Sequence, residues 1–124
     1  MSRKVLVVDD SASVRQQVRL ALDEAGFETV DAIDGVDGLN KLAEHPDLSL
    51  VICDVNMPNM DGLEMLEQAL AQPSTRDIPI VMLTTEGQPG MIERAKQAGA
   101  KGWIVKPFKP HLLVATAEKL AAQP

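Results

Sequence analysis

Short apolar runs alternate along the chain with longer segments in which apolar residues recur every three or four positions. The first pattern is typical of buried parallel strands, and the second is typical of amphipathic helices. We expect strands at Arg3–Val8, Glu28–Ala32, Leu50–Cys53, Ile78–Leu83 and Gly102–Val105. We expect helices at Ala12–Ala25, Val36–Glu44, Gly62–Ala71, Met91–Ala98 and His111–Ala122.

This regular alternation predicts an α/β fold: a doubly wound, five-stranded parallel sheet covered by helices on both faces. In such a sheet the carboxyl ends of the strands meet at one edge, where ligands bind. The chain has 124 residues, which suits one compact domain. We therefore expect a single domain over residues 1–124, with no output domain after it.

Charged residues follow three of the expected strands directly. Asp9 and Asp10 come after the first strand, Asp54 after the third, and Lys106 after the fifth. Three carboxylates at one edge of a sheet repel one another, and a divalent cation and an ammonium group relieve that repulsion. Hard oxygen ligands suit Mg²⁺, and zinc is disfavoured because no His or Cys lies in these motifs. The pattern predicts a metal held beside a reactive carboxylate.

Each of these residues also has a simpler interpretation. One aspartate of the Asp9-Asp10 pair could cap the following helix, although Ser11 or Ser13 could do so instead. Asp54 could be a turn residue, and Lys106 could be an ordinary solvated lysine. The sequence leaves open whether the Lys106-Pro107 peptide bond is cis.

Composition narrows the function classes. The net charge of −6 disfavours binding to nucleic acid, and three aromatic residues (one Trp and two Phe) are too few for a stacking platform. The single cysteine, Cys53, excludes an internal disulfide. No apolar run approaches the length of a signal peptide core or a membrane span, so we expect a cytoplasmic protein.

The motifs taken together resemble the receiver domain of two-component response regulators, and most closely the stand-alone chemotaxis (CheY-like) type. The resemblance spans Lys4 to Leu120 and is carried by four segments in the family's order and spacing. They are Val7–Ser11, Ile52–Gly62, Met82–Thr85 and Val105–Phe108. It implies the flavodoxin-like (βα)5 fold with strand order 2-1-3-4-5.

The resemblance assigns a chemical role to several residues. Asp54 would be the phosphoacceptor, and Lys106 would contact the phosphoryl group. Thr84 would form a hydrogen bond to that group after a rearrangement. Trp103 occupies the switch position, whose ring turns inward when Thr84 moves, so that the surface of helix four, strand five and helix five changes shape.

The resemblance also assigns the cofactor and the residues that tune it. Mg²⁺ would be bound directly by Asp10 and Asp54 and by the backbone carbonyl of Asn56, while Asp9 would place a bound water or share the ion. Asn56 and Glu86 occupy positions that set the lifetime of the phosphorylated state.

The function implied is that of a monomeric phosphorylation switch that catalyses only its own phosphorylation and dephosphorylation. A histidine kinase would donate the phosphoryl group, and a downstream protein such as the flagellar motor switch would read the result. Three alternatives stay open: a Mg²⁺-dependent phosphatase with an aspartyl nucleophile, a phosphate sink or phosphorelay intermediate, and a flavodoxin-like cofactor binder. The phosphatase usually needs an acid two residues after its nucleophile, where this chain has Asn56, and the last alternative lacks a glycine loop that cradles phosphate.

Overall fold

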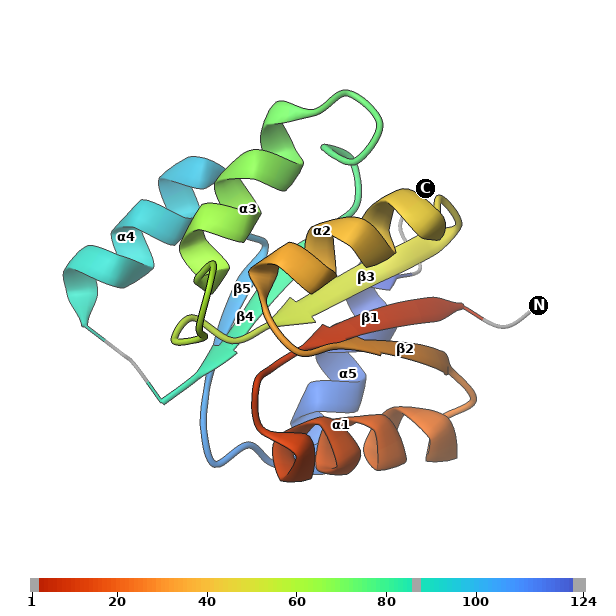
Figure 1. Ribbon diagram of the computed structural model, residues 1–124. Helices are drawn as coiled ribbons and strands as arrows, with labels where there is room; N and C mark the ends of the chain where they lie inside the picture. Colours follow the sequence, from red (N-terminus) through yellow and green to blue (C-terminus); the bar gives the residue numbers. More distant parts are fainter. Residues whose placement is uncertain (1–2, 86–87, 122–124) are drawn as a thin grey trace.

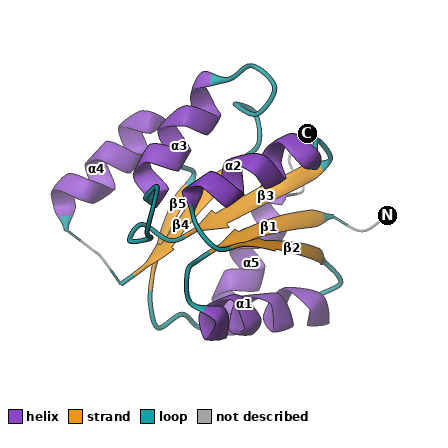
Figure 2. Cartoon of the chain, viewed as in Figure 1, coloured by secondary structure: helices purple, strands orange, loops and turns teal. Residues whose placement is uncertain are grey.

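The computed structural model describes residues 3–85 and 88–121 and has three layers, with one sheet between two layers of helices (Figures 1 and 2). The strands are β1 (Lys4–Val8), β2 (Glu28–Ala32), β3 (Leu48–Cys53), β4 (Ile80–Thr84) and β5 (Gly102–Val105). The helices are α1 (Ala12–Glu24), α2 (Gly35–Glu44), α3 (Gly62–Ala71), α4 (Pro89–Ala98) and α5 (Pro110–Ala121). The predicted α/β architecture is confirmed.

The five strands are parallel and lie in the order β2-β1-β3-β4-β5, as predicted. The register of the two central strands pairs Val8 of β1 with Cys53 of β3. The pairing continues one step further, because the Asp54 N–H donates to the Val8 carbonyl at 2.9 Å. The residues that follow β1 and β3, Asp9 and Asp54, are therefore neighbours across two adjacent strands.

Consecutive residues of the central strands point into two different cores. Val5, Val7, Leu50 and Ile52 pack with residues of α1 and α5 on one face. Leu6, Val8, Val51 and Cys53 pack with residues of α2, α3 and α4 on the other face. Because side chains alternate between the faces and both faces are covered, the strands read as unbroken apolar runs in the sequence.

Three strands have bounds that differ from the prediction. β1 begins at Lys4, one residue later than expected, and β3 begins at Leu48, two residues earlier. β4 runs from Ile80 to Thr84 rather than from Ile78 to Leu83. Pro79 has no N–H to donate to a ladder, so regular pairing starts after it. At its other end β4 extends to Thr84, whose carbonyl accepts from the Lys106 N–H.

The buried face of α2 also differs from the prediction. The apolar positions of this helix predict Val36, Leu39, Leu42 and Ala43 on its inward face. Leu42 is buried, but 44% of the surface of Val36 is exposed, and Gly35 and Gly38 are buried in its place. A Cβ atom on Gly38 would lie 2.8 Å from the Sδ atom of Met65. Glycine lets α2 approach α3 closely here, and the larger Val36 is left outside. Within residues 3–85 and 88–121, no helix is both long and apolar enough to cross a membrane.

Candidate functional site

Three aspartates meet at the carboxyl edge of the sheet, as the sequence predicts. Asp9 and Asp10 follow β1, Asp54 follows β3, and each contributes one carboxylate oxygen to a group in which all oxygens lie within 4.8 Å of one another. Asp9 and Asp54 are only 2% and 7% exposed, whereas Asp10 is exposed. Two charges are thus removed from water while the third remains open to it.

Lys106 brings a positive charge to this cluster from the end of β5. Its Nζ atom lies 2.7 Å from Asp9 Oδ2 and 3.4 Å from Asp54 Oδ2. Its backbone N–H donates to the carbonyl of Thr84 at 2.9 Å, and its peptide bond to Pro107 is cis. The lysine is therefore bound to two of the three aspartates and is not an ordinary solvated lysine.

The cap of α1 is Ser11, which frees the aspartates from that role. The Ser11 hydroxyl accepts from the Val14 N–H at 3.4 Å, and the Ser11 N–H donates to Asp9 Oδ1 at 2.9 Å. With Lys106 on Oδ2, both carboxylate oxygens of Asp9 already have partners. Asp10 is the aspartate of this pair that faces solvent.

The environment of Asp54 works against its ionised form. Burial raises the pKa of this carboxyl, and the nearby negative charge of Asp9 raises it further. Lys106, a hydrogen bond from the Thr84 hydroxyl and the Val55 N–H oppose the rise. A cation added beside Asp54 would relieve the remaining repulsion.

The loop after Asp54 is folded tightly against it. A Cβ atom on Gly62 would overlap the carbonyl oxygen of Asp54, and the Gly62 N–H donates to the Val55 carbonyl at 2.8 Å. Only glycine fits at this contact. Asn56, whose carbonyl is a predicted metal ligand, lies exposed in the same loop directly beyond Val55.

A hydrogen bond between Asn59 and Asp34 also holds this loop, and it was not predicted from the sequence. Asn59, with a left-handed φ of 67°, donates from its side-chain amide to Asp34 Oδ2 at 2.7 Å. Asp34 is buried before α2, and its other carboxylate oxygen accepts from the Asp37 N–H at 2.8 Å. The hydrogen bond from the Asp37 N–H, and next in size the one from the Asn59 amide, hold the pKa of Asp34 below its ordinary value. The signal available in the sequence was an aspartate just before an expected helix, a position where Asp34 can act as the N-cap.

Trp103 lies partly buried on β5, beside α4. It is paired in register with Met82 and lines a cleft with Ile92 and Ala95 of α4. Because Met82 and Thr84 are two residues apart on β4, Trp103 and Thr84 share the same face of the sheet. The predicted switch pair is therefore brought onto one side of the sheet, while Glu86 lies outside the described residues.

The sequence matches the response regulator receiver domain family over residues 5–118. The chain belongs to this family. Receiver domains are signalling switches of two-component systems, and membership implies a histidine kinase as phosphodonor and a downstream target. Receiver domains bind Mg²⁺ at an acidic pocket, and the Asp9, Asp10 and Asp54 cluster has the oxygen ligands that such a site needs.

Chemotaxis proteins are among the relatives of this receiver domain. It is 40% identical to chemotaxis protein CheY1 of Helicobacter pylori over 111 residues, which cover 89% of this chain and 90% of that protein. It is 42% identical to the structure of CheY4 of Vibrio cholerae, with a TM-score of 0.90, over 97% and 99% of the two chains. These findings confirm the CheY-like resemblance.

A further structure that resembles this receiver domain contains ligands. It is the CheX–CheY–BeF3–Mg²⁺ complex of Borrelia burgdorferi, with 27% identity and a TM-score of 0.90, over 98% of this chain and 90% of that one.

Proposed function

We propose that this receiver domain accepts a phosphoryl group on Asp54 from a histidine kinase. The observation that carries the proposal is the position of Lys106, whose Nζ atom contacts Asp9 and Asp54 together at 2.7 and 3.4 Å. A buried carboxylate with an ammonium beside it is suited to attack phosphorus, since the ammonium offsets charge on the transferring oxygens.

In the proposed step an oxygen of Asp54 attacks the phosphorus of a phosphohistidine. The new P–O bond makes an acyl phosphate, and the breaking P–N bond returns its electron pair to the imidazole of the donor. Bound Mg²⁺ would supply further charge neutralisation and orient the phosphoryl oxygens. Its ligands would be Asp10, Asp54 and the carbonyl of Asn56.

The hydrogen bonds of the two aspartates after β1 support a different role for each of them. Both carboxylate oxygens of Asp9 are engaged, by Ser11 and by Lys106. Asp10 is exposed, so its carboxylate can reach an ion without first breaking such contacts. This supports Asp10 as the direct ligand and Asp9 as the residue that places a bound water and holds the lysine.

Phosphorylation would then act on Thr84. Its hydroxyl is bound to Asp54 in the structure, and the added phosphoryl oxygens offer it new acceptors. Movement of Thr84 would vacate space on the face of the sheet that it shares with Trp103. The proposed output is a change in the α4-β5-α5 surface that a protein partner recognises.

The chemotaxis relatives support a partner in motility, for example the flagellar motor switch. In this proposal the protein works in the cytoplasm as a monomer. Hydrolysis of the acyl phosphate would reset the switch, with Asn56 and Glu86 setting its lifetime. A phosphate sink would use the same chemistry without the partner.

Labelling with acetyl phosphate tests the phosphoacceptor. Intact mass spectrometry should show one phosphoryl group on the wild type with Mg²⁺ and none with EDTA. The Asp54→Asn variant should stay unlabelled while keeping its circular dichroism spectrum, and Asp23→Asn, which changes an exposed aspartate of α1, should label normally. Labelling of Asp54→Asn to the wild-type level would reject the assignment, and repeated turnover of a small phosphomonoester would favour the phosphatase.

A further inference from the structure

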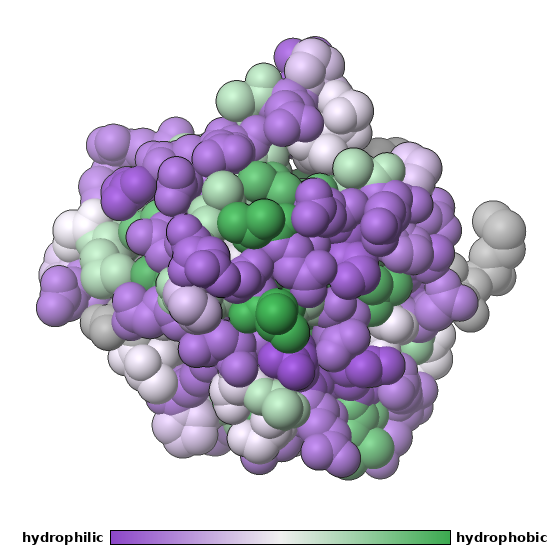
Figure 3. Space-filling view, in the orientation of Figure 1, coloured by the Kyte–Doolittle hydropathy of each residue, from purple (hydrophilic) through white to green (hydrophobic). Residues whose placement is uncertain are grey.

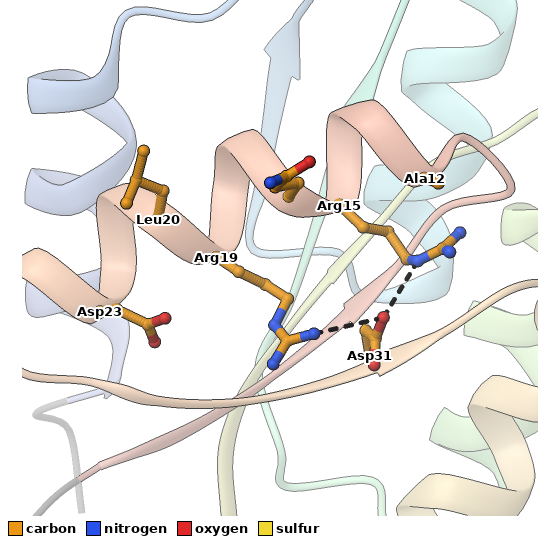
Figure 4. A pocket seen from close by; sticks show the side chains of 7 residues that line it. Ala12, Arg15, Arg19, Leu20, Asp23 and Asp31 are labelled. Atoms are coloured by element: carbon orange, nitrogen blue, oxygen red, sulfur yellow. Dashed lines mark hydrogen bonds and ion pairs between the residues drawn. The ribbon is translucent and has the colours of Figure 1, made fainter.

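Arg15 of α1 connects the acidic cluster to the edge of the sheet. Its Nη1 atom donates to the backbone carbonyl of Asp9 at 2.6 Å, and its Nε atom donates to Asp31 Oδ2 at 3.1 Å. Figure 4 shows the guanidinium beside Asp31, with Arg19 approaching the same carboxylate from the next turn of α1. The Arg15 side chain is 15% exposed and that of Asp31 is 39% exposed, so the arginine is largely buried while its anchor stays partly open to water.

The contacts of Arg15 belong to a chain of polar groups between α1 and β2. Arg19 Nη1 lies 3.5 Å from the shared Asp31 oxygen, and Arg19 Nε donates to the hydroxyl of Thr29 at 3.1 Å. Thr29 in turn donates to Asp23 at 3.2 Å. Within this chain of contacts, Arg15 is the member that reaches Asp9.

The carbonyl that Arg15 binds belongs to the peptide unit between Asp9 and Asp10. The Asp9 N–H is held by the carbonyl of Ala32 at 3.1 Å, and the Asp9 side chain is held by Ser11 and Lys106. The Ser11 N–H bond spans the following peptide and limits its rotation, and the bond from Arg15 adds a direct hold on the carbonyl of that peptide. That peptide sets the direction in which the Asp10 side chain leaves the backbone.

We propose that Arg15, anchored on Asp31, is a positioning residue that orients the Asp9–Asp10 peptide and so aims the Asp10 carboxylate toward the ion site beside Asp54. The proposal rests on the proposed function insofar as the ion is Mg²⁺. Planar guanidinium is suited to this task because its separate N–H groups bind two acceptors in a fixed geometry.

The sign of one measurement separates positioning from simple electrostatics. A positive charge near a cation site repels the cation, so removing Arg15 would tighten Mg²⁺ binding if its charge were its only influence. Loss of a residue that orients a metal ligand has the opposite effect and typically weakens binding by about 10-fold or more.

The test is calorimetric titration of the full chain with Mg²⁺ alone, together with amide exchange measured by NMR without metal. We expect Arg15→Ala to weaken Mg²⁺ binding about 10-fold and to speed exchange of the Ser11 N–H that donates to Asp9. Asp31→Asn, which removes the anchor, should act in the same direction. The matched control is Arg19→Ala, which removes the same charge and another partner of Asp31 but no bond to Asp9, and it should not weaken binding.

Arg15→Lys keeps the charge and guards against a variant that fails to fold. A single ammonium does not hold both acceptors in the same geometry, so this variant should also bind Mg²⁺ more weakly and exchange faster at Ser11. Wild-type or tighter binding in Arg15→Ala or Arg15→Lys, or weakening of the same size in Arg19→Ala, would overturn the proposal. Failure of the wild type to bind Mg²⁺ would instead overturn the proposed function, and the exchange rates at Ser11 would still decide whether Arg15 orders this turn.

Discussion

Lys106 lies closer to Asp9 than to Asp54: its ammonium nitrogen is 2.7 Å from the first carboxylate and 3.4 Å from the second. The shorter contact goes to the aspartate whose other oxygen is also engaged, by Ser11. Asp54 thus has the weaker hold on the lysine. In the proposed reaction, the ammonium can turn from Asp9 toward a phosphoryl oxygen on Asp54 without leaving the cluster.

Replacing Lys106 with methionine should therefore separate stability from reactivity. Two buried carboxylates would lose their shared cation, and we expect the free energy of unfolding to fall by roughly 1–3 kcal/mol without Mg²⁺. Added Mg²⁺ should restore most of the loss, while labelling by acetyl phosphate should be slower than in the wild type. Urea titrations with and without Mg²⁺ measure the first effect. Lys101→Met, at an exposed lysine before β5, is the control, and an equal response in both variants would contradict this interpretation.

The contact between Gly62 and Asp54 predicts opposite effects for two glycine-to-alanine changes. Gly62→Ala places a methyl group against the Asp54 carbonyl, so it should destabilise the protein by roughly 2 kcal/mol or more and disturb the site. Gly90, in the first turn of α4, has open space around the position of a Cβ atom. Gly90→Ala should stabilise by about 0.5–1 kcal/mol. Chemical denaturation measures both, and two changes of the same sign would show that backbone crowding at Asp54 is not decisive.

The hydrogen bonds to Asp34 predict a pH dependence in the acid range. Because the Asp37 N–H and the Asn59 amide favour the ionised carboxyl, the folded-state pKa of Asp34 lies below that of the unfolded chain. The stabilisation is complete above the ordinary carboxyl pKa of about 3.9 and is lost as pH falls through the lower folded value.

The matching variant is Asp34→Asn, which sets an amide against the amide of Asn59. It should lower the free energy of unfolding by about 1 kcal/mol at pH 7. The difference from the wild type should shrink as pH is lowered below about 4. Asp77→Asn, at an exposed position, should show no such trend. A difference that stays constant with pH would mean that the charge of Asp34 is irrelevant.

The paired side chains of Glu67 on α3 and Arg94 on α4 predict a local effect. Arg94 donates to both carboxylate oxygens of Glu67, at 3.2 and 2.8 Å. Ala95 of α4 is buried, Met91 and Ala98 pack partly buried against the core, and Gln88 at the start of the helix makes no side-chain cap hydrogen bond. Arg94→Ala should change global stability little, because the pair is exposed, but should speed amide exchange in α4 more than in α3. Gln97→Ala is the control on the same helix, and unchanged exchange in α4 would remove Arg94 from any role in holding it.

The fold could be predicted from the sequence because both faces of the sheet are covered. Runs such as the one ending at Val8 or at Cys53 must then be apolar throughout, and the residue after each run falls at the reactive edge. The start of β4 was harder to predict, because it depends on one backbone group, the N–H that Pro79 lacks. On α2, Leu42 was predicted correctly as buried, but Val36 was placed inward because it is apolar, whereas the close approach to Met65 required Gly38.

The candidate site was predictable to the extent that its residues follow strands. Asp9, Asp10, Asp54 and Lys106 stand directly after apolar runs, so the topology alone brings them together. Arg15 and Asp34 act through contacts with residues of other segments, Asp31 and Asn59, and the positions of strand ends in the sequence do not reveal these contacts. For Arg15 the available signal was its spacing of four from Arg19, which places both on one face of α1.

The bond between Lys106 and Asp9 joins residues 97 positions apart. A fragment that lacks either of these residues, or an intermediate in which β5 is still undocked, has no ammonium beside the carboxylates that follow β1 and β3. Under the proposed function, incompletely folded molecules would not be phosphorylated efficiently on Asp54. Only completely folded molecules would then transmit the signal.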